Sequence, residues 1–547
     1  MDASVRFNTE IVGALPVIVH YFERLRLSAT INEVVPWEGV VPLGTVVEIM
    51  IANRLLSPAP MYRVGAWAKE AGLTMYYRVT AEQLNDDLLG RALERVAKHA
   101  DVIEAALITR AIKVFKLEVN QIHFDITDVE LYGAYEQASA DGKTLPTPLP
   151  TYGRTKSGRK NVKQIGMGMN VTADGGVPIG HIPLDGNAAE SPVHLDNLRR
   201  LAKTLGKTDF LYLGDTKLDT TENLLLVAAG KGFFLCGGAF QTHLQEEYLK
   251  LRRRGKMHKV DYFPQSQASR PPEERDKYEA TETTAILEGT VDGKTIRVKY
   301  RLIFVWSEAK ARQEAQTRER HVSKIRDEFA AVERNLNKYS LTTQEKITGR
   351  LETAKAKYSE GSLFDYTLTK DKKGRFHLTW KINAQKLHRL QQLEGVYVLK
   401  TNLPSQRCPT AKALSTYKEQ SQVERRFHHL KGPLAVAPMF LEKPERMAGL
   451  LGILVWALMV MALMERQTRR GLKGKPLYGL YPENRPSPSP TGPAILKCFS
   501  TLCIVIIKEQ GKISRRLGDR TPIQQKLLHL LGIPPDGLRT FKRRCGT

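Results

Sequence analysis

The first part of the chain repeats apolar residues at helical spacing. In residues 41–56 an apolar side chain recurs every three or four positions, and the prolines of residues 57–62 end the pattern. Residues 84–115 form a longer amphipathic stretch, for which Asn85 is a suitable N-cap. We therefore predict a helical N-terminal domain over residues 1–112, of a kind that binds DNA or joins subunits.

From about residue 113 the spacing changes to the alternation of strands. Residues 117–127 alternate apolar and polar positions, and residues 163–187 have the pattern of a hairpin that turns at Asp174, Gly175 and Gly176. The elements predicted next are a helix over 191–205 capped by Ser191, a buried strand over 209–216, a helix from 220 capped by Asp219, and a strand over 233–238. This order, three strands and then helix, strand, helix and strand, is typical of a ribonuclease-H-like α/β fold with a mixed sheet, which needs one more helix.

An insertion delays that helix. We predict a hairpin over 286–306 that turns at Asp292 and Gly293, a charged helical segment over 308–358, a second hairpin over 364–382, and a returning strand over 395–402. The predicted domains are the helical domain (1–112), the two parts of the ribonuclease-H-like catalytic core (113–240 and 396–480), the β-rich insertion with its helical segment (241–395), and a C-terminal linker with a basic helical tail (481–547).

Residues 447–464 form an uncharged apolar run close to the shortest length that spans a bilayer. Because the chain has one such run, and a helix that is apolar on all sides also fits the core of a large domain, we predict a buried helix. The N-terminus lacks the pattern of a signal peptide. The five cysteines have no CxxC spacing, which indicates reduced thiols without zinc. We expect a cytoplasmic protein that does not enter the membrane.

The charge is strongly positive, with 83 Lys and Arg against 58 Asp and Glu and a formal net charge of +25. A basic chain of this size favours a polyanionic partner, and nucleic acid is a better candidate than an anionic membrane. One basic run contains Lys156, Arg159 and Lys160, and a second covers residues 249–259. We predict that both runs contact DNA phosphates, although basic runs are also common on solvated faces.

Three carboxylates lie on separate elements of the predicted core. Asp125 is inside the first strand, Asp215 ends the fourth, and Glu424 lies on a helix predicted over 417–433. Carboxylate oxygens are the ligands that divalent cations prefer, and three of them can hold two ions at a scissile phosphate. The alternatives are a structural aspartate at 125 and a helix N-cap at 215.

The helix over 417–433 has two distinct faces. Tyr417, Gln420, Glu424 and Lys431 share one side, because they are offset by 0, 3, 7 and 14 residues. An adjacent apolar stripe that can pack on the sheet consists of Val423, Phe427, Leu430 and Leu434.

The polar face resembles the tyrosine, arginine, glutamate, lysine signature of DDE transposases from bacterial insertion sequences. Tyr417, Glu424 and Lys431 match the signature, whereas Gln420 occupies the arginine position and Arg425 or Arg426 could supply the charge. Further blocks similar to one branch of this family, with a mainly β insertion, include HFDITDVELYG, PIGHIPLDGNAAES, LGDTKLDTTEN and YVLKTN. The resemblance covers residues from about 10 to 465.

The resemblance implies a catalytic domain in which Asp125, Asp215 and Glu424 hold two Mg²⁺ or Mn²⁺ ions. It implies an endonuclease that cuts DNA at terminal inverted repeats and joins the ends to target DNA, as a homodimer or larger assembly near the nucleoid. Tyr417, Gln420, Arg425 and Lys431 would lie near the DNA. The alternatives are a nuclease of the same fold without strand transfer and a non-catalytic DNA-binding protein.

Some members of the family stack a flipped base on a tryptophan of the insertion. Trp306 and Trp380 are the candidates in this chain, and packing in the core is an equally good interpretation of each.

Overall fold

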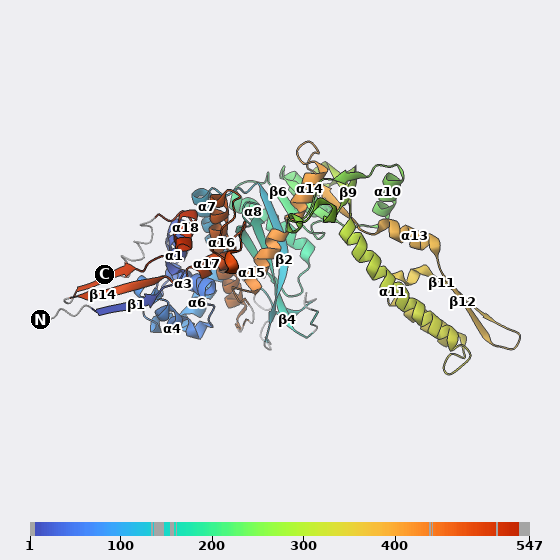
Figure 1. The fold of residues 1–547 in the computed structure, drawn as a ribbon, viewed down its shortest axis with the longest axis horizontal. Coiled ribbons are helices and arrows are strands. Elements are labelled where there is room, and N and C mark those ends of the chain that lie inside the picture. Colours follow the sequence, from blue (N-terminus) through green and yellow to red (C-terminus); the bar gives the residue numbers. More distant parts are fainter. Residues whose placement is uncertain are drawn as a thin grey trace. The chain divides into compact units, whose positions relative to one another are not determined.

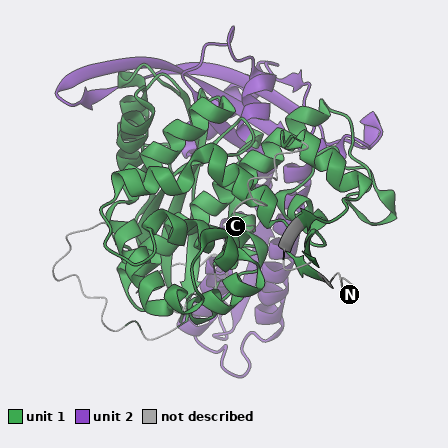
Figure 2. Cartoon of the chain, turned by 90° about the vertical axis from the view of Figure 1, so that its left-hand side faces the viewer, with its two compact units in different colours: residues 1–234, 418–547 green, residues 235–417 purple. Residues whose placement is uncertain are grey.

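The computed structural model describes residues 6–132, 135, 147–153, 158–159, 161–436, 439, 441–509 and 512–534. It belongs to the mixed α/β class, with helices around a large mixed sheet (Figure 1). The chain divides into two compact units (Figure 2). The first unit comprises residues 1–234 and 418–547, and the second comprises residues 235–417.

The core of the first unit is the long helix α16 (Pro444–Leu472). It contains the apolar run 447–464, and the apolar 18-residue window of this helix is 100% buried inside the protein, so the prediction of a buried helix is confirmed. The helices that surround it come from the N-terminal part of the chain, and the residues that contact it belong to α1 (Leu15–Leu25), α3 (Leu43–Leu56), α6 (Asp86–Lys98) and α7 (Ala100–Phe115). Strand β5 and helices α15, α17 and α18, described below, also contact α16, and together these neighbours exclude water from a helix that is apolar on all sides.

The remaining N-terminal helices are α2 (Leu27–Val34), α4 (Val64–Glu70) and α5 (Leu73–Tyr77). The predicted amphipathic stretch 84–115 forms two helices, α6 and α7, that are separated at His99. Asn85 caps α6 as predicted, since its side chain accepts a hydrogen bond of 2.9 Å from the backbone N–H of Leu88.

The sheet of the first unit is built around β2 (Gln121–Leu131), which pairs antiparallel with β4 (Lys163–Thr172) and parallel with β6 (Leu211–Gly214). Beside β4 lie β5 (Pro178–Asp185) and the short β3 (Thr151–Tyr152). Two helices, α8 (Glu190–Leu205) and α9 (Thr221–Ala229), come before and after β6 in the chain. The next strand is β7 (Phe233–Gly238). The predicted order of strands and helices is confirmed, with the two-residue β3 as an addition.

Two predicted helix caps are wrong. The N-cap of α8 is Ala189, and Ser191 lies inside the helix. The N-cap of α9 is Thr220, whose hydroxyl accepts a hydrogen bond from the backbone N–H of Asn223, whereas Asp219 lies one residue earlier. The extended backbone of Thr220 places its side chain over the first turn of the helix, as an N-cap requires.

The two ends of the described chain meet in a small sheet that the sequence did not predict. Strand β1 (Arg6–Ile11) pairs antiparallel with β14 (Cys503–Glu509), which pairs with β15 (Lys512–Leu517). Helices α17 (Gly492–Cys498) and α18 (Pro522–Leu530) flank these strands in the sequence. The prediction of a helical tail is therefore wrong for residues 503–509 and 512–517.

The second unit has its own strands and two hydrophobic cores. The end of β7 pairs with β13 (Val396–Thr401), followed by β10 (Lys294–Ser307), β9 (Tyr278–Val291) and β8 (His258–Val260). Its helices are α10 (Thr242–Arg253), α11 (Glu308–Arg334), α12 (Gln344–Ala356), α13 (Ala384–Leu393) and α14 (Thr410–Lys418), and its second hairpin is β11 (Phe364–Lys370) with β12 (Phe376–Ile382). Both predicted hairpins and the charged helical segment are confirmed.

Candidate active site

Asp125 lies on the face of β2 that is covered by the start of helix α15 (Ser421–Lys431). Alternate residues of a strand share a face, so Asp125 is on the same side as Gln121 and His123. Both of these contact the chain just before α15. Gln121 donates a 3.0 Å hydrogen bond to the carboxylate of Glu419, and His123 Nδ1 lies 3.2 Å from Gln420 Oε1. Asp125 itself is half-buried, and its carboxylate accepts a bond from the N–H of Ile126.

Asp215 directly follows the last residue of β6, the strand that pairs in parallel with β2. The parallel register pairs His123 with Leu213, and two further residues along each chain lead to Asp125 and Asp215. The Asp215 carboxylate accepts a 2.8 Å hydrogen bond from the N–H of Lys217, which stabilises the turn after the strand. The interpretation of Asp215 as a helix N-cap is wrong, because Thr220 caps α9. The two aspartates therefore start from adjacent strands at the carboxyl end of β6, where α/β sheets commonly bind ligands.

The predicted single helix over 417–433 is two helices. Helix α14 ends at Lys418 and α15 begins at Ser421. At the junction, backbone bonds from Gln422 to Glu419 and from Val423 to Gln420 tighten the turn. At this junction the amide of the Gln420 side chain donates to the carbonyl of Phe124 at 2.8 Å, and its oxygen faces His123. Both polar groups of Gln420 are thus used to join α15 to β2.

This break separates Tyr417 from the rest of the predicted face. Tyr417 is the last residue of the second unit, whereas Gln420, Glu424 and Lys431 belong to the first. Glu424 lies in the first turn of α15, one turn after Gln420, and it is exposed. Arg425 is also exposed, and so is Lys431, which lies two turns further along the same side as Glu424.

The apolar stripe of this helix is confirmed. Val423 and Leu430 are fully buried, Phe427 is nearly so, and Leu434, just after the helix, is also buried. Contacts of α15 with β2 and β4 show that this stripe packs on the sheet. The position of Glu424 relative to β2 is therefore determined by packing as well as by Gln420.

The three carboxylates have the donor chemistry of a magnesium or manganese site, since both ions prefer hard oxygen ligands. The last β2–β6 pair, His123 with Leu213, lies two residues before Asp125 and Asp215, and Glu424 is on the helix whose N-cap, Gln420, is bonded to β2 next to Asp125. In the described part of the chain, no group of three or more His, Cys, Asp or Glu side chains is arranged to hold a metal ion. The three carboxylates thus fit such an ion by their donor chemistry, whereas the described side chains do not form a three-ligand cluster.

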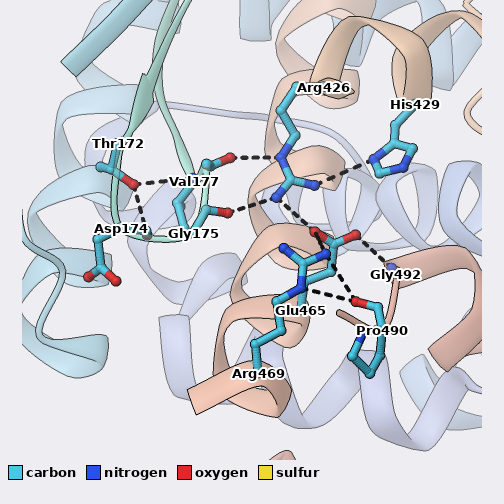
Figure 3. Close-up of polar contacts among 11 residues, drawn as sticks. Thr172, Asp174, Gly175, Val177, Arg426, His429, Glu465, Arg469, Pro490 and Gly492 are labelled. Atoms are coloured by element: carbon cyan, nitrogen blue, oxygen red, sulfur yellow. Dashed lines mark hydrogen bonds and ion pairs between the residues drawn. The ribbon is translucent and has the colours of Figure 1, made fainter. Parts of the chain in front are cut away.

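Arg426, one of the two residues suggested to supply the charge of the signature arginine, is instead buried and fixes α15 to its surroundings (Figure 3). Its guanidinium donates to the carbonyls of Gly176 at 2.7 Å and Gly175 at 2.8 Å, which form the turn between β4 and β5. It also forms an ion pair with Glu465 of α16, with Nη2 2.8 Å from Oε2. The two side chains are 2% and 0% exposed. One buried arginine thus connects α15, the β4–β5 turn and the central helix.

The carboxylate of Glu465 has further partners on the other side (Figure 3). It accepts a 2.6 Å hydrogen bond from the N–H of Gly492, and Arg469 Nη2 lies 3.4 Å from it. Arg469 also donates to the carbonyl of Pro490. Burial alone would raise the pKa of Glu465, but the neighbouring arginines and these hydrogen bonds hold it below its usual value, so the group is ionised at neutral pH.

The β4–β5 turn is held from a second side by Arg466. Its guanidinium pairs with the carboxylate of Asp174 and donates to the carbonyls of Phe115 and Lys116. Gly175 and Gly176 both have positive φ, of 90° and 61°, which confirms the predicted turn. Arginines from two adjacent helices therefore hold the hairpin that lies next to β2.

Two buried histidines near these contacts are neutral. Burial lowers the pKa of His123 to about 4, and the bond to Gln420 opposes this only partly. Burial also lowers the pKa of His429, beside Arg426, to about 4, although Glu465 acts in the opposite direction. Neither ring adds positive charge to the site at neutral pH.

Of the first basic run, only Arg159 lies in the described part of the chain; Lys156 and Lys160 lie outside it. Arg159 is 57% exposed and donates to the hydroxyl of Tyr132 at 2.7 Å and to the carboxylate of Glu130 at 3.3 Å. The second run is exposed at its basic positions from Lys250 to Lys259, at the end of α10 and the start of β8. Their contact with DNA stays a prediction.

The two tryptophan candidates have different environments. Trp380 packs in a core of the second unit, where Phe329 contacts its ring edge-on at 5.7 Å and its Nε1 donates to Glu333. Trp306 is half-buried and lines a cavity of about 550 Å³ together with Tyr248, Arg252 and Arg312. Both rings are half-buried and pack against a core of the second unit, so core packing fits both, and Trp306 in addition lines a cavity.

Comparison with known proteins gives little to identify the chain. Residues 7–104 match a family that is described as a domain of unknown function, DUF4277. This match covers N-terminal helices and ends before β2, so it includes none of the three carboxylates. No curated protein matches the chain.

Proposed function

We propose that this protein is a metal-dependent DNA transposase with a ribonuclease-H-like catalytic domain and Asp125, Asp215 and Glu424 as its catalytic carboxylates. The observation that carries the proposal is the parallel register of β2 and β6, whose last pair, His123 with Leu213, lies two residues before Asp125 and Asp215. The attachment of α15 to β2 through Gln420 supports Glu424 as the third carboxylate. The resemblance to insertion-sequence transposases supports the reaction class.

The three carboxylates would hold Mg²⁺ or Mn²⁺, and such ions, when bound, activate the attacking oxygen and stabilise the leaving oxygen of a phosphodiester. The protein's own part is to position these groups. Gln420 and the buried Arg426 fix α15, and Arg425 and Lys431 present exposed cations on the same helix. In this proposal the two cations bind phosphates next to the cut, and Arg159 extends the contact along the DNA.

The substrate in this proposal is double-stranded DNA, namely the inverted-repeat ends of an insertion sequence and a target site. The net charge of +25 supports a long DNA contact. In this proposal a homodimer or a larger assembly holds the two element ends together. The protein would act at the bacterial nucleoid, where its DNA substrate lies. Trp306, with its cavity, is the residue we propose for a flipped base if cleavage proceeds through a DNA hairpin.

The test uses the purified chain, Mg²⁺ and two labelled substrates, an intact element end and a pre-cleaved end with target DNA. We expect cleavage of the first and joining of the second. Asp125→Ala, Asp215→Ala and Glu424→Ala should each abolish both products while DNA binding survives, and Asp128→Ala, on the same strand, should retain activity. Cleavage without joining would favour a nuclease, and DNA binding without either product from the unmodified chain would favour a non-catalytic DNA-binding protein. Cleavage that survives all three changes would overturn the assignment of the carboxylates.

A further inference from the structure

A large groove lies between helices α11 and α12 in the second unit. Its volume is about 1230 Å³, and it is lined by both helices and by the loop that joins them. Small side chains form much of its wall, among them Ala331, Gly349 and Thr353. Because these residues leave room between the helices, the groove can admit an extended chain.

The charged residues that line this groove are mostly basic. Lys338, Lys346, Lys357 and Arg350 are all exposed, and Glu328 is the one acidic residue among the described residues that line it. Glu328 pairs with Arg350 at 3.0 Å, with the two side chains 39% and 60% exposed. Three lysines thus remain to attract an anion, and an exposed ion pair of this kind is weak enough to rearrange around a ligand.

The loop between the helices presents an aromatic ring at the groove. Tyr339 is 87% exposed, and it has a positive φ of 53°, which is uncommon for a residue with a bulky side chain. The loop is fixed by Asn337, whose amide donates to the carbonyl of Phe376 at 2.9 Å and accepts from its N–H at 2.7 Å. The ring is therefore held out in solvent by an ordered backbone, at a cost that a solely structural tyrosine would not require.

We propose that the α11–α12 groove binds single-stranded DNA, with phosphates on Lys346 and Lys357 and one base stacked on Tyr339. A row of cations beside an exposed aromatic ring is the chemistry by which proteins bind single strands. A duplex fits less well, because its bases are stacked on one another and offer no free face to Tyr339.

This site differs from the proposed catalytic site. It contains none of the three carboxylates, and it lies in the other compact unit. Binding of single-stranded DNA to this groove needs no metal ion, so the affinity can be measured in the presence of a chelator. If the protein proved to have no nuclease or transposase activity, the proposal for this groove would still stand or fall by its own test.

The test measures the affinity of the full chain for a fluorescent oligothymidine strand and for a blunt duplex, over a series of salt concentrations and with EDTA. Tyr339→Ala should weaken binding of the single strand about 5-fold or more, since stacking of a base contributes about 1–3 kcal/mol. Tyr339→Phe, which keeps the ring, should bind as the unmodified chain does. Neither change should alter the affinity for the duplex.

The lysines are tested by a charge reversal with a matched control. The double change Lys346→Glu and Lys357→Glu should reduce the slope of log affinity against log salt by about 1.4, that is about 0.7 for each lost phosphate contact. The control, Lys294→Glu with Lys299→Glu, makes the same change of net charge on β10, away from the groove. This control should change the slope of log affinity against log salt less than the double change in the groove does.

Three results would overturn the proposal. The first is an unchanged affinity for the single strand after Tyr339→Ala. The second is an equal effect of the two charge reversals. The third is an equal loss of duplex and single-strand binding from the groove changes, which would indicate a general electrostatic contact.

Discussion

Arg426 of α15 and Glu465 of α16 form an ion pair from which water is excluded. The pair joins the helix that carries Glu424 to the central helix of the first unit, and the same guanidinium holds the carbonyls of Gly175 and Gly176. A buried pair of this kind contributes little net stability compared with an apolar pair, but removal of one partner leaves an uncompensated charge. Its value to this protein is that it fixes the position of α15.

Arg426→Met should therefore destabilise the first unit by about 3–5 kcal/mol, because Glu465 would stay buried without its main partner. Urea unfolding followed by tryptophan fluorescence measures the change. The double change Arg426→Met and Glu465→Gln should be more stable than the single one, since glutamine is neutral and can still accept from the N–H of Gly492. Arg425→Met, at the exposed neighbouring position, should stay within about 0.5 kcal/mol of the unmodified chain.

If the double change were as unstable as Arg426→Met alone, the buried charge would not be the cause of the loss. The lost bonds to Gly175 and Gly176 would then account for it.

The sequence was sufficient to predict those turns and strands whose signal lies in neighbouring residues. The turns at Gly175 and at Gly293 were predicted correctly, because a positive φ at a hairpin turn favours glycine. Strand β1 was missed, because its partner β14 lies near the other end of the chain and nothing beside β1 in the sequence indicates the pairing. Strand β14 was missed as well, although one of its partners, β15, follows it closely in the sequence.

For the candidate site, apolar runs were enough to predict the strands next to Asp125 and Asp215. The break before α15 was not predicted, because helical spacing continues through it, and the bond of Gln420 to β2 at the break is a tertiary contact that the spacing does not reveal. Arg426 gave a signal that went unused. It lies three residues after Val423 and four before Leu430, so it stands on the apolar stripe, where a charge indicates a buried partner.

Gly175→Ala should loosen the β4–β5 turn. An added Cβ would lie 2.8 Å from the Cβ of Arg466, and φ is 90° there. Gly206→Ala is the matched control, since φ is 64° and no atom lies within 4 Å of the added Cβ. We expect Gly175→Ala to cost about 1–3 kcal/mol more than the control in urea unfolding, which is the cost of overpacking. Equal costs would mean that the Arg466 stem moves aside freely.

Gln420→Ala tests whether the bond between α15 and β2 matters to the reaction. If the proposed function is right, loss of the two side-chain bonds should let Glu424 shift, and a displacement of about 1 Å can lower a cleavage rate by about 100-fold. Binding of element ends should change much less, because the exposed cations remain. Gln422→Ala, two residues along, is the control and should cleave at close to the normal rate. An equal fall in binding and cleavage would instead point to a direct DNA contact by Gln420.

Burial of His194 predicts a loss of stability in mild acid. The ring is 2% exposed, its Nδ1 lies 3.1 Å from the Tyr212 hydroxyl, and burial lowers its pKa from 6.5 to about 4. Burial raises the pKa of Tyr212, so that hydroxyl stays neutral in this range. Between these two pKa values the unfolded chain binds more protons at this position than the folded protein does.

The stability contributed by neutral His194 is therefore complete above about pH 6.5 and is lost as the pH falls towards 4. The shift corresponds to at most about 3 kcal/mol. Urea unfolding at a series of pH values should show a slope in this window that becomes shallower in His194→Gln, which cannot take up the proton. His529→Gln, at an exposed position of α18, should leave the slope unchanged. A slope that stays the same in His194→Gln would show that other buried groups cause the acid sensitivity.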